Sequence, residues 1–189
     1  KTNTFKSYTR ELGLTRPGAQ VFSLNGLFVD SRNNIWIRRI GGYSVYIDSQ
    51  DTLVNFVAEK EPDNVSAIVY AFAEDKQGRV WMSCVNGVAG YGLAEDPAKG
   101  IVQKLPLQPG GMYMEDDYFA MGTDNSGNVW GVSDKQLVKI NTSDFSISTF
   151  DFRYGVDNPE FFGFIILPDD ELVMGARNGI VLGNPHELR

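Results

Sequence analysis

Three aspartates in this chain of 189 residues each stand six residues before a tryptophan, and the chain has no other tryptophan. The pairs are Asp30 and Trp36, Asp75 and Trp81, and Asp124 and Trp130. A recurring carboxylate can serve acid–base chemistry, or it can accept hydrogen bonds within a turn. A recurring tryptophan can offer a flat surface to a sugar ring, or it can fill a core. A binding site rarely recurs once per repeat, so the recurrence favours the structural interpretation of both.

The residues between each aspartate and its tryptophan are typical of a tight turn that leads into an apolar strand. Gly78 and Gly127 stand three residues after their aspartates, and Asn33 takes this place in the first copy. Glycine and asparagine tolerate the positive φ of hairpin turns, and aspartate at the head of a turn accepts hydrogen bonds from N–H groups two or three residues on. We therefore predict β-hairpins, with each tryptophan buried and its indole N–H donated to a backbone carbonyl.

The other candidates for chemistry stand alone. Cys84 is the single cysteine and has no histidine near it in sequence, so a buried thiol is expected rather than a nucleophile. His186, the only histidine, lies near the end of the chain and is expected to face solvent. The run Glu115–Asp117 lacks the alternating spacing of a calcium loop and is expected to be a solvated acidic loop. We predict no catalytic residue, metal or cofactor.

The aspartate–tryptophan sequence marks a repeat. The tryptophans are 45 residues (36 to 81) and 49 residues (81 to 130) apart, and a degenerate copy, Leu167–Val173, places Val173 after 43 more. Periods of this size indicate a repeat architecture. Each copy divides into short strands separated by Gly, Asn, Asp and Pro, and helical periodicity is almost absent.

We expect four strands, a to d, in each repeat. Strand a leads to the aspartate and strand b carries the tryptophan. Strand c is predicted to begin at Gly42, Gly87, Gln136 and Gly179. Strand d is predicted over Leu53–Val57, Ile101–Leu105 and Phe145–Phe150. Residues Thr4–Tyr8 resemble a strand d that stands before the first full repeat, and the last repeat ends after strand c.

Four-stranded repeats of this length match the blades of a β-propeller. We therefore predict one all-β domain over residues 1–189, either a complete propeller of about four four-stranded blades or a fragment of a larger one. The blades are placed near 14–58, 59–106, 107–151 and 152–185, with Thr4–Tyr8 as a lone outer strand. This strand can pair with Ile180–Leu182 and close the ring within one chain. An open arc would instead expose apolar blade faces to a second copy, as in a homodimer.

The overall composition is that of a soluble globular protein. Hydrophobic residues make up 42% and charged residues 22% of the chain. The net charge of −7 argues against binding to nucleic acid or to an anionic membrane, because both favour basic surfaces. No run of about twenty apolar residues is present to span a bilayer.

These motifs resemble the two-component regulator propeller repeat. The resemblance is carried by Glu11–Leu14 with Asp30 and Trp36, by Asp75, Trp81 and Asn86–Gly87, and by Asp124 and Trp130. The segments Tyr154–Phe161, Met174–Ile180 and Asn184–Pro185 are similar to the last propeller repeat before an Ig-like β-sandwich domain in such sensors. The first copy departs from the family at Asn33 and at Arg38–Arg39.

The resemblance implies a periplasmic sensor domain of a Bacteroides-type two-component protein. Such ectodomains belong to inner-membrane sensor histidine kinases, and many of them sense glycan fragments. The neighbouring partners would be further propeller repeats and an Ig-like sandwich domain of the same protein. A kinase domain is absent from the sequence, so no phosphotransfer is expected in this chain.

Our leading hypothesis is a non-catalytic propeller segment that binds an oligosaccharide. The predicted ligand contacts lie in the b–c and d–a loops and carry planar or forked donors. They are Arg39, Tyr113, Arg153, Arg177 and Asn178. One alternative is a propeller-type glycoside hydrolase or lyase; a sialidase-type site would need arginines around a tyrosine nucleophile, and the spacing of Arg16 and the other arginines does not gather them. The other alternative is a protein-interaction scaffold.

Overall fold

The computed structural model describes residues 26–39, 41–57, 69–84, 87–104, 117–151, 161–177, 179–185 and 187–188. Within them the chain forms four antiparallel sheets, each built from consecutive strands. The first sheet contains β1 (Leu27–Val29), β2 (Ile35–Arg39), β3 (Gly42–Ile47) and β4 (Thr52–Val57). The second contains β5 (Val69–Glu74), β6 (Arg79–Cys84), β7 (Gly87–Leu93) and β8 (Ile101–Lys104).

The other two sheets repeat this order. The third contains β9 (Ala120–Thr123), β10 (Val129–Val132), β11 (Gln136–Ile140) and β12 (Ile147–Asp151). The fourth contains β13 (Phe161–Ile166), β14 (Leu172–Ala176) and β15 (Gly179–Gly183). Two short 3-10 turns, η2 (Asp48–Gln50) and η4 (Pro97–Lys99), precede the last strand of the first two sheets. No helix among the described residues is long and apolar enough to cross a membrane.

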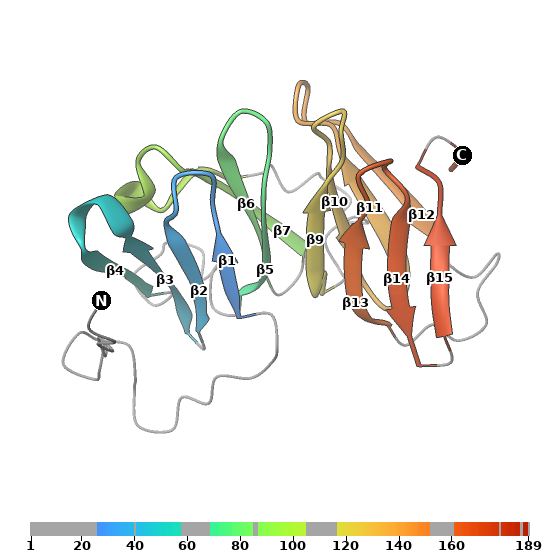
Figure 1. Cartoon of the computed structure of the whole chain (residues 1–189), viewed down its shortest axis with the longest axis horizontal. Coiled ribbons are helices and arrows are strands. Elements are labelled where there is room, and N and C mark those ends of the chain that lie inside the picture. Colours follow the sequence, from blue (N-terminus) through green and yellow to red (C-terminus); the bar gives the residue numbers. More distant parts are fainter. Residues whose placement is uncertain are drawn as a thin grey trace, which may run out of the picture.

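The sheets stand face to face in an arc, as the blades of a β-propeller do, so the predicted fold class is confirmed (Figure 1). The a–b turns lie along the upper edge of Figure 1, and the b–c turns of the first and fourth blades lie along its lower edge. The first strand of each blade (β1, β5, β9 and β13) is an edge strand, and these four follow one another across the middle of the arc.

The strand order within the blades agrees with the sequence prediction. Every strand c begins at its predicted residue, because Gly42, Gly87, Gln136 and Gly179 open β3, β7, β11 and β15. The strand d boundaries are less exact: β4 begins one residue before Leu53, and β12 ends one residue after Phe150. The largest difference is at the start of β12. Phe145 was expected to open a strand d, but its φ of 60° places it in the left-handed region and the strand begins at Ile147. The preceding turn, in which the Phe145 N–H donates to the Asn141 carbonyl at 2.8 Å, takes it out of the ladder.

The degenerate fourth copy keeps the backbone of the turn without its aspartate. The Leu167 N–H donates to the Glu171 carbonyl, and the Asp170 N–H donates to the Leu167 carbonyl, both at 2.9 Å. Asp170 has a φ of 70°, close to the 64° of Asn33 and the 72° of Gly78 at the same place in their turns. A positive φ at the third step is therefore what all four turns require, and aspartate meets it here at a steric cost.

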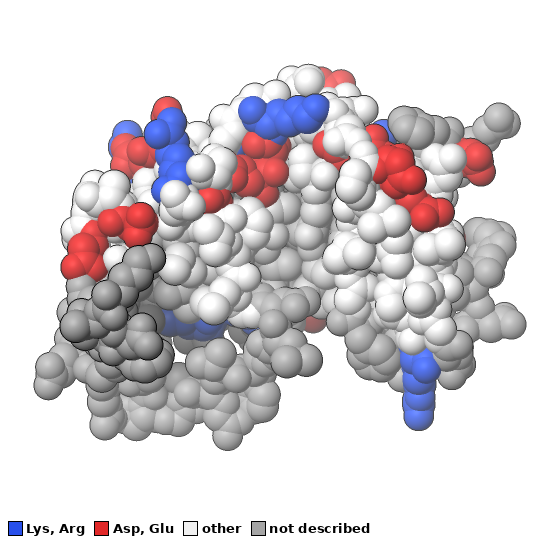
Figure 2. Space-filling view, viewed as in Figure 1, with Lys and Arg blue, Asp and Glu red and all other residues white. Residues whose placement is uncertain are grey.

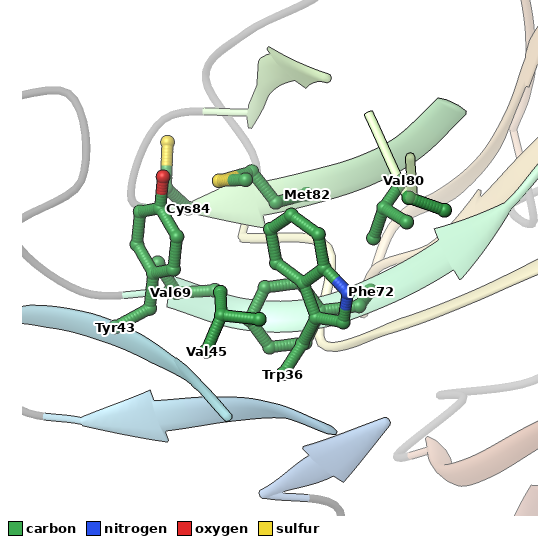
Figure 3. Packing of buried hydrophobic residues seen from close by; sticks show 9 residues of the cluster. Trp36, Tyr43, Val45, Val69, Phe72, Val80, Met82 and Cys84 are labelled. Atoms are coloured by element: carbon green, nitrogen blue, oxygen red, sulfur yellow. The ribbon is translucent and has the colours of Figure 1, made fainter. Parts of the chain in front are cut away.

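The core lies between the blades rather than within them. Figure 3 shows the first of three clusters, in which Trp36, Tyr43 and Val45 of the first blade face Phe72 and Met82 of the second. Equivalent clusters form around Trp81, between the second and third blades, and around Trp130, between the third and fourth. Each tryptophan is fully buried. Its ring therefore packs its own blade against the next one.

The two end faces of the arc carry most of the exposed apolar side chains of the described residues. Leu27 and Val29 on the first blade are 67% and 57% exposed. Ile165, Ile180 and Leu182 on the fourth blade are 58%, 71% and 59% exposed. In the described part of the chain these blades stand at opposite ends, and β15 is the outer strand of its sheet. Strand Thr4–Tyr8, predicted to close the ring against β15, lies outside the described residues.

Candidate functional site

Each repeated aspartate uses its carboxylate fully inside its own turn. In the second repeat, Asp75 Oδ1 accepts from the main-chain N–H groups of Gln77 at 2.9 Å and Arg79 at 3.0 Å. Its Oδ2 accepts from Arg79 Nε at 2.6 Å and from the Trp81 indole at 2.7 Å. A carboxylate has about four acceptor positions, and these four bonds account for them. The group therefore serves the turn rather than a substrate.

The first and third repeats carry the same four bonds. Asp30 accepts from Arg32 N, Asn34 N, Asn34 Nδ2 and Trp36 Nε1 at 2.8–2.9 Å. Asp124 accepts from Ser126 N, Asn128 N, Asn128 Nδ2 and Trp130 Nε1 at 2.8–3.0 Å.

Two details of the predicted turn are wrong. The carboxylate accepts from N–H groups two and four residues on, because the N–H three residues on, in Asn33 for example, donates to the aspartate's own carbonyl. The indole N–H donates to the carboxylate and not to a backbone carbonyl. A charged acceptor makes the stronger hydrogen bond, and the turn brings it within reach of the ring.

Sequence reasoning missed the residue four places after each aspartate. Asn34 and Arg79 bind their own aspartate and also donate to the next blade. Asn34 Nδ2 donates to the Ala94 carbonyl at 3.0 Å, and Arg79 Nη2 donates to the Thr142 carbonyl at 2.7 Å. The guanidinium also lies over the Trp81 ring, 5.5 Å from its centroid. The available signal was a side-chain N–H donor at this place in all three complete copies, against Glu171 in the degenerate one.

Hydrogen bonds between successive turns tie the blades along the rim formed by the a–b turns. The Ser31 N–H and hydroxyl both donate to the Glu74 carboxylate at 2.6 Å. Thr123 Oγ1 donates to the Glu74 carbonyl at 2.8 Å, and the Asn125 N–H donates to Asp170 at 2.6 Å. Figure 2 shows carboxylates gathered along this edge with a few basic side chains among them. The rim is thus a line of satisfied polar contacts.

A second polar cluster lies away from the a–b turns, at the other end of the first strands of the blades. These strands (β1, β5, β9 and β13) are called the inner strands below. The Tyr70 hydroxyl donates to Asp117 Oδ2 at 2.8 Å, and the Arg38 guanidinium lies 5.1 Å from the centre of the Tyr70 ring. These residues come from the ends of β2 and β5 and from the segment before β9, so they belong to three blades. Burial, followed by the hydrogen bond to Asp117 and its charge, raises the pKa of Tyr70 to about 12. The tyrosine is therefore a neutral donor at physiological pH.

A groove of about 260 Å³ runs along the inner strands. It is lined from all four blades, by Leu27 and Phe28, by Phe72, by Phe119 and Met121, and by Phe164. Tyr70 directly precedes the residues of β5 that line it, and Asp117 lies two residues before Phe119. The cluster of Arg38, Tyr70 and Asp117 adjoins these segments in sequence, but none of the three is among the described residues that line the groove.

Two of the five predicted ligand contacts, Arg39 and Arg177, are among the described residues. Arg39, half-buried at the end of β2, and Arg177, exposed in the turn after β14, belong to blades at opposite ends of the arc. Tyr113, Arg153 and Asn178 lie outside the described residues. The cluster that does form was missed, although Arg38 adjoins Arg39 and Asp117 ends the acidic run. Asp117 is exposed, as expected, and it also accepts the Tyr70 hydroxyl.

The remaining candidates form no metal-binding or nucleophilic site among the described residues. Cys84 is buried in the first inter-blade cluster, and burial, followed by the charge of Asp117, raises its pKa to about 12. No group of three acidic, histidine or cysteine side chains in the described part of the chain is arranged to hold a metal ion. Arg16 and His186 fall outside that part.

Residues 65–86, which include the Asp75 turn and Trp81, match the family model described as two-component regulator propeller. This segment is thus similar to one two-component regulator propeller repeat. No match was found among curated protein sequences.

Solved structures with a similar fold include two from B. thetaiotaomicron, the extracellular domains described as those of the hybrid two-component systems BT4673 and BT3049. Both have a TM-score of 0.68, with 18% and 17% identity over 86% and 89% of this chain. Virginiamycin B lyase from Staphylococcus aureus is also similar, with a TM-score of 0.59 and 16% identity over 86% of this chain and 56% of the lyase. The propeller repeats of this chain span about a quarter of the two ectodomains, 23% and 24%.

Proposed function

We propose that this chain is a non-catalytic segment of the extracytoplasmic propeller of a two-component sensor. The observation that carries the proposal is the conjunction of the family match at residues 65–86 with four blades whose two end faces are apolar and exposed. Inside the arc, the equivalent faces are covered by the next blade. Further propeller blades of the same protein would cover the outer faces in the same way, with an Ig-like sandwich domain beyond them.

The sensor would lie in the periplasm as part of an inner-membrane histidine kinase and would recognise glycan fragments. Support for a polar, uncharged ligand comes from the cluster of Arg38, Tyr70 and Asp117, which brings one charge of each sign beside the Tyr70 ring and hydroxyl. Hydroxyl groups of a sugar pair well with such mixed donors and acceptors. Arg39 of the first blade and Arg177 of the fourth remain proposed ligand contacts.

A hydrolase or lyase is the second candidate, because Tyr70, Asp117 and Arg38 bring a phenol, a carboxylate and a guanidinium together. A tyrosine nucleophile must lose its proton at working pH. A pKa raised to about 12 by burial and by Asp117 opposes that loss. The likeness to virginiamycin B lyase extends to the fold alone. We therefore favour binding over turnover.

The test is a thermal-shift and calorimetric screen of the whole chain against oligosaccharides from plant, host and microbial glycans. Chromatography of the same mixtures detects any product. Saturable binding without product formation supports the sensor. Turnover of any substrate establishes the enzyme. A chain that binds no oligosaccharide but captures a second propeller domain with a defined stoichiometry supports the scaffold instead.

A further inference from the structure

Each inner contact of the arc joins two unlike faces of neighbouring blades. We call the face that carries the tryptophan of strand b the front of a blade, and the opposite face its back. In the first contact, Phe72 on the back of the second blade packs against three rings on the front of the first blade, those of Phe28, Trp36 and Tyr43, with ring centroids 6.0–6.4 Å apart. The Trp36 ring also lies so close to Gly92 on the same back that a Cβ there would be 2.9 Å from it. The front therefore supplies the large aromatic side chain, and the back leaves room for it.

The front of the fourth blade, one of the two end faces, departs from this pattern. Strand pairing places aliphatic side chains at the positions of the three rings, namely Ile165, Val173 and Ile180. Ile165 and Ile180 are 58% and 71% exposed. A Cβ on Gly163 or Gly175, which belong to the same face, would meet no atom within 4 Å. This front thus lacks the large aromatic side chain and has open space beside its aliphatic ones.

The back of the first blade, the other end face, shows the opposite change. Leu27, which is 67% exposed, has the position of Phe72. Tyr46 has the position at which the other three blades carry Gly92, Ile140 and Gly183. An aromatic residue therefore stands on this back where the other blades have none. Because Val173 is much smaller than tryptophan, the front of the fourth blade has room for Tyr46, whereas a front with tryptophan would bring a second large ring to the same place.

The rim of a–b turns shows a matched change on the same two faces. In the first contact, the Ser31 N–H and hydroxyl on the first blade donate to the Glu74 carboxylate on the second. The position of Ser31 holds Pro168 in the fourth blade, and the position of Glu74 holds Val29 in the first. Proline has no N–H to donate, and valine has no side-chain acceptor. Either change alone would leave a polar group without its partner at a contact, whereas the two together leave none.

We infer that the front of the fourth blade binds the back of the first blade of a second copy of this chain, with Val173 against Tyr46 and Pro168 against Val29. In the described part of the chain, the blades that carry these faces stand at opposite ends of the arc, so each face is left for another copy (Figure 1). Further blades of a longer protein would compete for the same two faces. The inference therefore goes beyond the proposed function and does not rest on it.

The number of blades indicates how many copies associate. A contact between unlike faces gives a ring if the rotation between copies closes, and an open filament if it does not. Two copies of four blades bring eight, which lies within the range of roughly four to eight blades of known propellers, whereas three copies would bring twelve. The assembly is therefore a closed dimer with two equal contacts.

The experiment measures the association of the whole chain by sedimentation velocity over a range of concentrations. Val173→Trp puts the missing ring on the front of the fourth blade, where it would meet Tyr46, and Tyr46→Ala removes the ring from the back of the first. The double variant recreates the inner contacts, in which a tryptophan on the front faces a small residue on the back. Val102→Trp, on β8 away from both faces, and Tyr46→Phe, which loses only the hydroxyl bond to Asp51, are the controls.

We expect the wild-type chain to form a dimer and nothing larger. Each single variant should raise the dissociation constant at least about tenfold, and the double variant should return it to within about threefold of wild type, because the two substitutions compensate only if the residues are in contact. Both controls should behave as wild type. The midpoint of urea unfolding checks that each variant is folded, and Tyr46→Leu replaces Tyr46→Ala if that midpoint falls.

Four results would overturn the inference, and none of them bears on ligand binding by the sensor. A double variant whose dissociation constant rises by the product of the two single effects would show that Val173 and Tyr46 do not meet. Equal weakening by Val102→Trp would place the contact elsewhere. Growth beyond two copies with rising concentration would exclude the closed ring, and the absence of any association would exclude the contact itself.

Discussion

Asp124 shows at the residue scale how the repeated carboxylate acts. Burial raises its pKa, but the hydrogen bonds from Trp130 and Asn128 and the charge of Lys139 outweigh that effect, so the pKa of Asp124 is lowered overall. A carboxyl group with a lowered folded pKa stabilises the fold fully above its unfolded pKa. That contribution is lost as the pH falls through the folded pKa.

We expect Asp124→Asn to destabilise the chain by about 1–3 kcal/mol at pH 7. In asparagine an NH2 group replaces one carboxylate oxygen, so two of the four N–H donors lose their acceptor. Urea unfolding between pH 7 and pH 2 measures the effect. The difference from wild type should shrink as the pH drops below the ordinary value of 3.8. Asp144, an exposed carboxylate bonded to Ser146, is the control position, and Asp144→Asn should change stability far less. A difference that stays constant with pH would contradict this account.

Cys84 provides a second residue-scale prediction. Its thiol is buried, and its pKa is raised from 9.0 to about 12, chiefly by burial and then by Asp117. At pH 8 the thiolate should therefore be about a thousandfold scarcer than in an unperturbed cysteine. We expect a thiol-specific chromogenic reagent to label the folded chain at the rate of unfolding and the urea-denatured chain at once. Rapid labelling under native conditions would show that the thiol is accessible.

At the scale of elements, the blades are held at fixed spacing by contacts too close for extra atoms. A Cβ on Gly92, in β7 of the second blade, would lie 2.6 Å from the Gly100 carbonyl oxygen and 2.9 Å from the Trp36 ring of the first blade. The tryptophan therefore packs against bare backbone. This explains why β7 has glycine at position 92, where it faces the tryptophan of the preceding blade.

Gly92→Ala should destabilise the chain by about 1–3 kcal/mol, the usual cost of overpacking a close contact. The midpoint of denaturant unfolding gives the measurement. Gly175, in β14, has open space around the position of a Cβ, so Gly175→Ala is the matched control and should change stability little. Equal stability of the two variants would place the Trp36 ring elsewhere.

Much of this element-level arrangement follows from the sequence, and some of it does not. The Asp–Gly–Trp spacing predicts the turn, the strand order and the start of each strand c, because these depend on local φ preferences and alternation. The cluster of Arg38, Tyr70 and Asp117 could not be predicted, since its members are joined only by the stacking of three blades. Phe145 misled the prediction because an aromatic residue ordinarily favours a strand, whereas here it leaves the ladder to stack on Tyr91 of the neighbouring blade.

At the scale of the whole molecule, the arc has two unlike ends. The first blade presents Leu27 and Val29, and the fourth presents Ile165, Ile180 and Leu182, on the face that carries tryptophan in the other blades. Inside the arc these two kinds of face pack on each other. We propose that, without further blades, a second copy covers them in a head-to-tail contact and gives a homodimer.

Ile180→Lys should shift this association towards the monomer, because a charge would be placed in a contact that is otherwise apolar. Sedimentation velocity across a range of concentrations measures the shift. Val102 is 41% exposed on β8, away from both end faces, so Val102→Lys is the control and should sediment as wild type. A wild-type chain that stays monomeric at every concentration would refute the dimer.

The polar rim has a mechanical consequence. The bonds from Ser31 to Glu74, from Thr123 to Glu74 and from Asn125 to Asp170 join neighbouring blades along one edge. At the opposite edge, the Tyr70 hydroxyl of the second blade donates to Asp117 of the third. The second and third blades are therefore hydrogen-bonded at both edges, so a change in the angle between them must stretch a bond at one edge or the other. A force applied at either edge of this pair would then be carried by both blades together.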